Sequence, residues 1–255
     1  MGFFYFYGMD IRHYLDSTYL KTAEQAGVSY EKNFEVALGF VKEAIDEQFK
    51  LIMIRPDVVS VAKKMVMAAE SMVLVGTVID FPEGKSTVSE KLDEAAKAVT
   101  DGADELDFVI DYEAFKSGNS DKVREEVIRC TEFGLSHHKV VKWIIEVAAL
   151  RPEQIVQLSA LVKNTVIAHF KETNFADIFV KSSTGFYKTA DGLPNGATVP
   201  AIILMLENAS PLPVKAAGGV RTYEEAIEMV RLGVKRIGTS AAKAIAHHKE
   251  ASGEY

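Results

Sequence analysis

Short apolar runs alternate with longer stretches of helical periodicity along most of the chain. The runs at 51–54 and 178–180 have no polar interruption, which is typical of strands buried on both faces of a parallel sheet. Between such runs, apolar residues recur three or four positions apart, and this spacing predicts amphipathic helices. The pattern predicts strands at 51–54, 72–79, 105–110, 140–145, 178–181, 213–215 and 235–237, and helices at 30–49, 57–69, 86–101, 121–135, 152–171, 198–208, 223–232 and 240–248.

These segments form seven clear strand–helix units, and a weaker strand at 13–18 adds an eighth. Strands that alternate with helices predict right-handed βαβ crossovers and a parallel sheet. Eight such units in 255 residues favour an α/β fold closed into a single (β/α)8 TIM barrel, and a doubly wound open sheet is the alternative. Since no linker divides the chain, we expect one catalytic domain over 1–255, with a loose leader at 1–9 and a flexible tail at 249–255.

Two helix starts can be assigned to particular residues. Pro152 suits the first turn of the helix at 152–171, because its fixed φ angle matches a helix and the missing N–H would have no partner there. Ser86 is a plausible N-cap of the helix at 86–101, and Ser89 is the alternative.

Composition and charge exclude several classes of function. The net charge is −7 and no dense stripe of Lys and Arg occurs, so binding to nucleic acid has little support. No run of roughly 18 apolar residues is present, so we expect no membrane-spanning helix. The single cysteine fits a reducing cytoplasm. The adjacent histidine pairs at 137–138 and 247–248 lack the spacing of metal ligands, and we expect no metal site.

Charged residues stand on three predicted strands of the barrel, whose carboxyl ends carry the active site of a (β/α)8 barrel: Asp107, Lys181 and Lys215. One lysine at a strand end usually reaches solvent, but two on neighbouring strands disfavour each other's charge. A neutral amine near pH 7 requires a pKa lowered by roughly 3 units, which partial burial beside a like charge can supply. Such an amine attacks a carbonyl group and forms a Schiff base, while the second lysine and a carboxylate move protons.

Glycine-containing loops follow the last two predicted strands. Gly218 and Gly219 precede the helix that begins near residue 222, and Gly238 to Ser240 precede the last helix. Backbone N–H groups at helix N-termini bind anions, and the loops after strands seven and eight are the usual phosphate site of this barrel. Glycine pairs are common in turns, but their position beside two lysines favours a phosphate-binding role.

The chain resembles the deoxyribose-phosphate aldolase family from about residue 10 to residue 255. The resemblance rests on many motifs in the same order, so it is much more specific than a single glycine pattern. They are LDST at 15–18, TVIDFPEG at 77–84, GADELD at 102–107, VKWIIE at 141–146, DIFVKSSTG at 177–185, KAAGGVRT at 215–222 and RIGTS at 236–240.

The resemblance implies a class I aldolase that needs no metal or other cofactor. Such an enzyme reversibly splits 2-deoxy-D-ribose 5-phosphate into D-glyceraldehyde 3-phosphate and acetaldehyde, in the catabolism of deoxyribonucleotides. Its partners would be this sugar phosphate and these aldehydes, with neither nucleic acid nor membrane, and a second copy of the chain in a homodimer is a further expectation.

Matched position by position, the resemblance also implies residue roles. Lys181 would form the Schiff base, Lys215 would perturb Lys181 and transfer protons, and Asp107 would complete the proton relay through water. The remaining matches are Asp16 and Thr18, which would line the site, Thr184, which would contact sugar hydroxyls, and a phosphate cradle of Gly185, Gly218, Gly219, Val220, Arg221, Gly238 and Ser240. Some members end in a mobile tyrosine implicated in moving the C2 proton, and Tyr255 fits that pattern, although a tail without a role is the alternative.

The chain departs from the family pattern at several positions. Ser182 replaces a threonine and keeps the hydroxyl group, whereas Ala241 replaces a serine and could remove one phosphate contact. Met53 stands where a cysteine is frequent, so a thiol open to attack by aldehydes is absent. The further departures are Ala216 for a proline, and Val147 with Ala148 for a Thr-Gly pair near the expected substrate position.

Two other functions remain open at this point. The chain could be a different Schiff-base barrel, such as a transaldolase-like enzyme or another sugar-phosphate aldolase, and a screen of donor aldehydes and ketones would separate these. It could also be a sugar-phosphate-binding barrel that has lost catalysis, which the presence of all three catalytic candidates opposes.

Overall fold

Eight parallel strands close into a barrel in the computed structural model, which describes residues 10–190 and 193–249. Each strand pairs with the next one in the sequence, and the last pairs with the first, so the sheet has no edge. The strands are β1 (Leu15–Tyr19), β2 (Leu51–Ile54), β3 (Leu74–Ile79), β4 (Glu105–Val109), β5 (Val140–Ile144), β6 (Ile178–Lys181), β7 (Val214–Ala217) and β8 (Arg236–Thr239). This closed order confirms the predicted (β/α)8 TIM barrel and excludes the doubly wound sheet.

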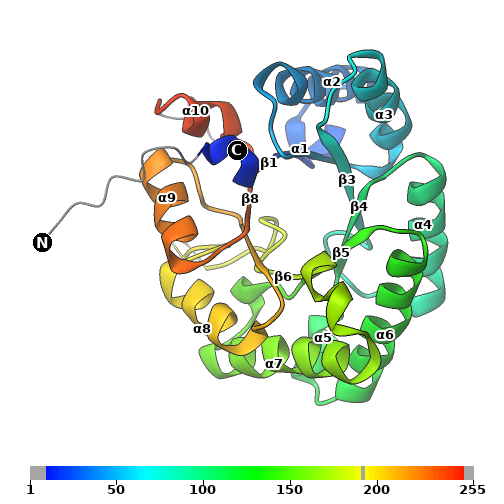
Figure 1. Cartoon of the computed structure of the whole chain (residues 1–255), viewed down its shortest axis with the longest axis vertical. Helices are drawn as coiled ribbons and strands as arrows, with labels where there is room; N and C mark the ends of the chain where they lie inside the picture. Colours follow the sequence, from blue (N-terminus) through cyan, green and yellow to red (C-terminus); the bar gives the residue numbers. More distant parts are fainter. Residues whose placement is uncertain (1–9, 191–192, 250–255) are drawn as a thin grey trace, which may run out of the picture.

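Helices surround the barrel on its outside (Figure 1). The helices that follow the strands are α2 (Tyr30–Glu47), α3 (Val59–Ala68), α4 (Val88–Thr100), α6 (Ser120–Ser136), α7 (Pro152–His169), α8 (Val199–Ala209), α9 (Tyr223–Leu232) and α10 (Ala242–Ala246). Shorter elements, too short to show a helical period in the sequence, lie in the connections: α1 (Ala23–Ala26), α5 (Tyr112–Lys116), and the 3₁₀ turns η1 (Ile11–Tyr14), η2 (Pro56–Val58), η3 (Val147–Ala149) and η4 (Glu172–Asp177).

The structure corrects the predicted start of α4. Its N-cap is Thr87, whose hydroxyl accepts a hydrogen bond from the N–H of Glu90, while the Glu90 carboxylate accepts one from the N–H of Thr87. Both predicted caps, Ser86 and Ser89, are therefore wrong, because only Thr87 has a glutamate three residues later to complete a capping box. Ser86 instead donates its N–H and its hydroxyl to the carboxylate of Asp80.

The two ends of the chain also differ from their prediction. β1 starts at Leu15, two residues later than expected, because the preceding residues form η1. The final helix is shorter than predicted and begins two residues after Ser240. Residues 1–9 and 250–255 lie outside the described residues, so the predicted leader and nearly all of the predicted tail remain predictions.

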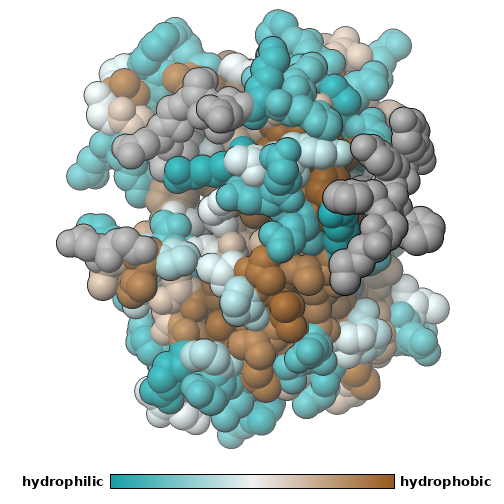
Figure 2. Space-filling view, turned by 90° about the vertical axis from the view of Figure 1, so that its left-hand side faces the viewer, coloured by the Kyte–Doolittle hydropathy of each residue, from teal (hydrophilic) through white to brown (hydrophobic). Residues whose placement is uncertain are grey.

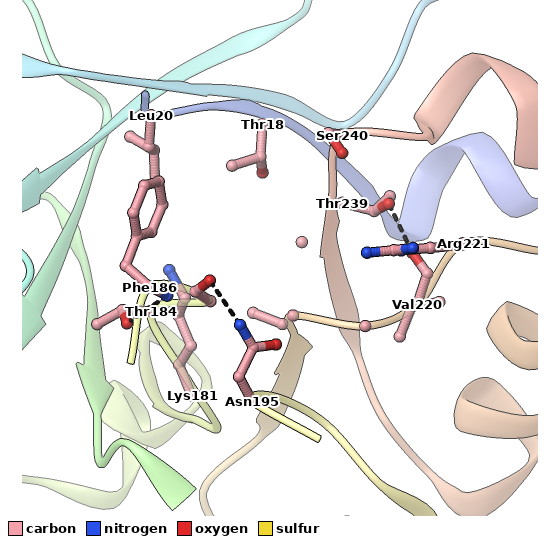
Figure 3. Close-up of a pocket in the computed structure, with 15 residues that line it drawn as sticks. Thr18, Leu20, Lys181, Thr184, Phe186, Asn195, Val220, Arg221, Thr239 and Ser240 are labelled. Carbon is pink, nitrogen blue, oxygen red and sulfur yellow. Dashed lines mark hydrogen bonds between the residues drawn. The ribbon is translucent and has the colours of Figure 1, made fainter. Parts of the chain in front are cut away.

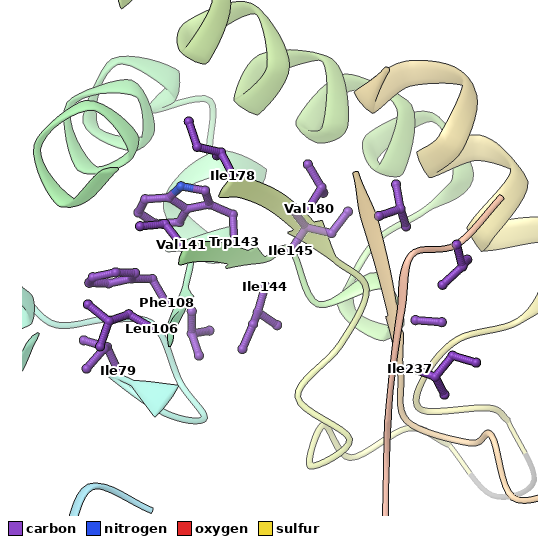
Figure 4. Close-up of a cluster of buried hydrophobic side chains, with 14 of the residues drawn as sticks. Ile79, Leu106, Phe108, Val141, Trp143, Ile144, Ile145, Ile178, Val180 and Ile237 are labelled. Carbon is purple, nitrogen blue, oxygen red and sulfur yellow. The ribbon is translucent and has the colours of Figure 1, made fainter. Parts of the chain in front are cut away.

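The main hydrophobic core lies between the barrel and the surrounding helices (Figure 4). Because successive strand residues point to opposite faces, alternate positions such as Phe108 and Trp143 face outward into this core. The rings of these two residues stack at 5.3 Å between centroids. The indole N–H of Trp143 donates to the hydroxyl of Thr131 on α6 at 3.0 Å, so the one polar atom of this buried side chain is satisfied.

The interior of the barrel has an apolar part beside a charged part. Leu51 and Met53 of β2 pack with Val78 of β3 and with Leu20 in a cluster separate from the main core. Gly76 makes room for this cluster, because a Cβ atom there would lie 2.7 Å from Cε of Met53. The other strands direct charged side chains inward, and these form the base of the site described below.

Figure 2 shows the side of the molecule on which Figure 1 places α8 and α9, and a hydrophobic area occupies much of its lower half. α8 is apolar along most of its length, and its Ile203 is exposed. Large apolar areas on a surface commonly bind another protein chain. Within 10–190 and 193–249, no helix has the length and apolar character needed to cross a membrane.

Candidate active site

Lys181 and Lys215 are paired residues on neighbouring strands, and both amines contact one carboxylate oxygen. Strand register places Lys181 of β6 opposite Lys215 of β7. Asp107 of β4 reaches across the barrel, and its Oδ2 lies 2.9 Å from Nζ of Lys181 and 3.0 Å from Nζ of Lys215. All three side chains are buried, with Lys181 the most exposed at 3%. The three residues predicted to carry the chemistry are therefore in direct contact.

Asp107 belongs to a closed ring of six charged side chains of alternating sign, which we call the interior ring. Lys215 also lies 2.6 Å from Asp16, and Asp16 in turn lies 2.6 Å from the guanidinium of Arg236. Arg236 donates two parallel hydrogen bonds of 3.1 Å to Glu105. Lys142 closes the ring, because its Nζ lies 2.5 Å from both Glu105 and Asp107. In order around the ring, the members are Lys142, Asp107, Lys215, Asp16, Arg236 and Glu105.

The interior ring has three cations and three anions, and Lys181 is an additional cation attached to it. Burial lowers the pKa of Lys181 to about 8, and the charges of Lys215 and Lys142 act in the same direction, although Asp107 opposes them. Burial acts to raise the pKa of Asp107, but Lys142, Lys181 and Lys215 together hold it well below its usual range. At neutral pH the site therefore combines a firmly ionised carboxylate with an amine that readily loses its proton.

Lys142, Glu105 and Arg236 had no predicted role. Lys142 lies within an apolar run on β5, where a lysine is unexpected, and it pairs with Asp107 in the strand register. Lys142 is completely buried and pairs with the carboxylates of Asp107 and Glu105. Burial acts to lower the pKa of Lys142, but these carboxylates outweigh it and raise the pKa. The sequence signal for this residue was a lysine inside an apolar strand, because a buried lysine needs anionic partners.

A cavity opens above Lys181 at the carboxyl ends of the strands (Figure 3). Leu20 and Phe186 lie on one side of this cavity, and Arg221 with Ser240 lies on the opposite side. Every residue predicted for the phosphate cradle lines it, together with Thr18 and Thr184. The lining residues that were not predicted are Leu20, Phe186, Asn195, Ala217 and Thr239. Asp16, Asp107 and Lys215 lie beneath the cavity rather than on its surface.

The loops around the cavity present unpaired backbone donors. The N–H groups of Gly185, Gly218, Gly219, Val220 and Ser240 donate no hydrogen bond to any other residue within the described ranges. The N–H groups of Arg221 and Thr222, just before α9, are occupied, since the Glu225 carboxylate accepts from both. The glycine-containing loops before the helices therefore supply the anion-binding donors that these two residues do not.

Close backbone contacts hold these loops in place. Gly218 has a φ of +81°, and a Cβ atom there would lie 3.0 Å from Cα of Gly196. A Cβ atom on Gly196 would lie only 2.4 Å from the carbonyl oxygen of Gly218. Asn195 links the loops further, because its side-chain amide donates a hydrogen bond to the carbonyl oxygen of Gly185 at 3.1 Å. Only glycine permits this approach of the loop before α8 to the loop after β7.

Glu146, which follows β5, fixes the position of Thr184. Its Oε2 atom accepts from the N–H of Thr184 at 3.1 Å and also binds the Thr184 hydroxyl. Its Oε1 atom is buried and has no hydrogen-bond partner among the described residues. Burial raises the pKa of Glu146 to about 7, against the opposing effect of its bonds to Thr184. The motif around Glu146 was noted in the sequence, but a role for its side chain was not predicted.

The remaining predictions concern metals and the tail. Within the described part of the chain, no group of three His, Cys, Asp or Glu side chains is arranged to hold a metal ion. His247 binds the carboxylate of Glu47, and His137 binds a backbone oxygen in its own helix. Tyr255 lies outside the described residues, so its part in the reaction is not addressed by the structure.

Comparison with known proteins agrees with this geometry. A family model for DeoC/LacD family aldolases matches residues 20–248. The deoxyribose-phosphate aldolase of Thermococcus gammatolerans is 37% identical over 235 residues, which are 92% of this chain and 94% of the relative. The structure of an aldolase designated QR15 is 32% identical, with a TM-score of 0.75 over 94% of this chain and 95% of that one. A tetrameric deoxyribose phosphate aldolase from Aeropyrum pernix is 26% identical, with a TM-score of 0.74 over 93% and 89% of the two chains.

Proposed function

The chain belongs to the DeoC/LacD aldolase family, as its motifs predicted, and we propose that it reversibly cleaves 2-deoxy-D-ribose 5-phosphate into D-glyceraldehyde 3-phosphate and acetaldehyde. The observation that carries this proposal is the contact of both lysines with Asp107 beneath a cavity lined by free backbone N–H groups. Relatives with more than 30% identity over most of both chains are named for this activity, which supports the choice of substrate.

In the proposed reaction, the neutral amine of Lys181 adds to the aldehyde carbon C1 of the open-chain sugar, and loss of water gives a protonated Schiff base. A base takes the proton of the C3 hydroxyl, the C2–C3 bond breaks, and its electron pair flows into the Schiff base. Glyceraldehyde 3-phosphate leaves and an enamine remains. Protonation of the enamine at C2, followed by addition of water at C1, releases acetaldehyde and restores Lys181.

Asp107 and Lys215 are suited to the proton transfers of this cycle. Because Asp107 Oδ2 contacts both amines, a proton leaving Lys181 has a short route to the neighbouring acid–base groups. The low pKa of Asp107 keeps it ionised, so it acts as the fixed charge that orients both lysines, and the relay to substrate proceeds through water.

The phosphate group would lie on the Arg221 and Ser240 side of the cavity. The unpaired N–H groups of the two glycine-containing loops supply its hydrogen bonds, and the Arg221 side chain supplies positive charge. Thr184 on the opposite side is then placed to contact the sugar hydroxyls, with Thr18 between the two sides (Figure 3).

Reduction with borohydride in the presence of acetaldehyde, followed by peptide mapping, tests the mechanism. The ethyl adduct is expected on Lys181 and is expected to be absent from the Lys181→Met variant. An adduct on another lysine, or none, would overturn the proposed chemistry. A screen with acetaldehyde, acetone and dihydroxyacetone as donors then tests the substrate, since a preference for dihydroxyacetone would indicate a different aldolase of this family.

We further propose that the enzyme acts in deoxyribonucleotide catabolism in the cytoplasm and forms a homodimer. The hydrophobic area in Figure 2 and the tetrameric assembly of the Aeropyrum pernix relative support association of copies. Light scattering on the eluting peak of a size-exclusion column measures the assembly directly, and a monomer at micromolar concentration contradicts the homodimer.

A further inference from the structure

Two members of the interior ring, Glu105 and Arg236, lie below the cavity and do not line it. Glu105 precedes Asp107 by two residues on β4, and Arg236 precedes Gly238 by two residues on β8, so both face the barrel interior one layer deeper. Both are nearly inaccessible, at 1% and 5% exposure. Neither residue can touch a substrate that lies in the cavity, and the proposed mechanism uses neither of them.

Burying these two charged side chains is nevertheless unfavourable unless each charge has a partner. A buried charge without a partner is strongly unfavourable, and here Arg236 and Glu105 satisfy each other by two parallel hydrogen bonds. Each also connects to the next member of the ring, Arg236 to Asp16 and Glu105 to Lys142. The pair therefore completes a chain of contacts that ends at Asp107 from both directions.

Within the ring, every cation lies between two anions and every anion lies between two cations. Lys181 is different: among the described residues its one ion-pair partner is Asp107, whose two oxygens already bind Lys142 and Lys215. Since the ring is neutral without Lys181, a proton on this amine would give the ring and Lys181 together a net positive charge. A proton on Lys181 is thus held less firmly than on an exposed lysine.

We propose that Glu105 and Arg236 are positioning residues that keep the interior ring neutral and thereby let Lys181 lose its proton readily and react as the uncharged amine. The inference rests on the proposed function, because it concerns the same Schiff-base lysine. The groups that face Lys181 from the surrounding elements are Asp107 on β4, Lys142 on β5, Lys215 on β7 and Glu146 after β5. Glu105 and Arg236 do not contact Lys181 and act on it indirectly, through the other members of the ring.

The test compares three variants: Arg236→Met, Glu105→Gln, and the double variant. Removing Arg236 alone leaves the ring with a net negative charge, which favours the protonated form of Lys181. Removing Glu105 alone leaves a net positive charge, which disfavours it. Removing both restores neutrality. The readout is the pH at which the rate of borohydride trapping with acetaldehyde reaches half its maximum, because this rate follows the fraction of neutral amine and does not require turnover of the sugar.

We expect the half-maximal pH to rise in Arg236→Met and to fall in Glu105→Gln, each by on the order of one pH unit, the size of shift that a nearby unit charge produces. The double variant is expected within a few tenths of a unit of the wild type. Lys215→Met serves as the positive control, because the charge of Lys215 lowers the pKa of Lys181 directly. Shifts of the same sign in both single variants, or an unchanged pH in both, would overturn the proposal.

If one single variant does not fold, the remaining variants still decide the question. A shift of the expected sign in the remaining single variant, together with a double variant that retains the wild-type profile, supports the neutral ring. A double variant displaced as far as Lys215→Met contradicts it. Failure of the proposed function is distinguishable, because the wild-type protein would then show no trapping on Lys181 at any pH. Trapping on Lys181 with no shift in any ring variant would reject the inference alone.

Discussion

Asp107 Oδ2 lies 2.9 Å from Nζ of Lys181, yet the pKa of this lysine is lowered to about 8. A carboxylate at this distance normally stabilises an ammonium group and raises its pKa. The effect is overcome here by complete burial, assisted by the charges of Lys215 and Lys142, which share the same carboxylate. Because Asp107 is shared among three lysines, its charge only partly offsets the burial of Lys181, and this amine loses its proton more readily than an exposed lysine does.

Activity should therefore rise with pH as Lys181 loses its proton. Because the folded-state pKa of Lys181 is depressed to about 8, the neutral fraction increases roughly tenfold for each pH unit below 8 and levels off above it. The initial rate of retro-aldol cleavage at subsaturating substrate, measured from pH 5.5 to 9.5, checks this. In Lys215→Met the inflection should move to higher pH and the maximal rate should fall by about 10²–10⁴-fold, the usual loss when an acid–base group is removed. An unmoved inflection would contradict the electrostatic role of Lys215.

Glu146→Gln should stabilise the protein at high pH and not at low pH. The pKa of Glu146 is raised to about 7 by burial, so the folded state favours the protonated form. Its stability contribution is fully present below the unfolded pKa of roughly 4.3 and is lost as the pH rises through 7. Neutral Gln keeps the shape and can still accept from Thr184 without a buried charge. Urea unfolding at pH 5 and at pH 8.5 measures the difference.

The expected gain for Glu146→Gln at pH 8.5 is about 1–3 kcal/mol, and little change is expected at pH 5. Glu83→Gln is the matched control, because Glu83 is 62% exposed and pairs with Lys85 at the surface. A destabilisation by Glu146→Gln at pH 8.5 would show that the charge of Glu146 is needed for its bonds to Thr184.

Gly196→Ala should weaken phosphate binding. The added Cβ would meet the carbonyl oxygen of Gly218 at 2.4 Å, so the two loops must separate and the N–H groups after β7 must shift. We expect KM for 2-deoxyribose 5-phosphate to rise by about tenfold, equivalent to about 1.4 kcal/mol. The rate with unphosphorylated 2-deoxyribose should change far less. Gly39→Ala in α2 is the control, since a Cβ atom there meets nothing within 4 Å. Equal losses with both sugars would place the effect outside the phosphate cradle.

The protein should tolerate high concentrations of acetaldehyde. Cys130 is the single cysteine of the chain, and it is buried on α6 with its pKa raised to about 12 by burial, so almost no reactive thiolate forms at neutral pH. Met53 differs, because it lies inside the barrel in a cluster with Leu20, which lines the cavity above Lys181. Residual activity after incubation in acetaldehyde should therefore decay more slowly than in Met53→Cys, which restores a thiol at that position. Identical decay of the two proteins would refute this explanation.

The sequence alone determined the order of elements and the strand ends at which chemistry occurs. Apolar runs alternating with amphipathic segments identified β2 to β8, and the charged residues on those strands identified Asp107, Lys181 and Lys215. These features could be read because they depend on neighbours within one turn or one strand. The capping of α4 shows the limit, since Thr87, Ser86 and Ser89 differ only in which neighbour completes the cap.

Only the tertiary structure decided which inward-facing residues meet across the barrel. Arg236 and Asp16 are 220 positions apart, and their contact depends on the closure of β8 onto β1 and on the stagger of the strands. The same closure places Lys142 between two carboxylates, whereas Lys181 pairs with Asp107, a carboxylate that also binds Lys142. A pKa is set by burial and by charges in space rather than along the chain, so the sequence could indicate Lys181 as the candidate, but only the closed barrel shows the burial and the charges that lower its pKa.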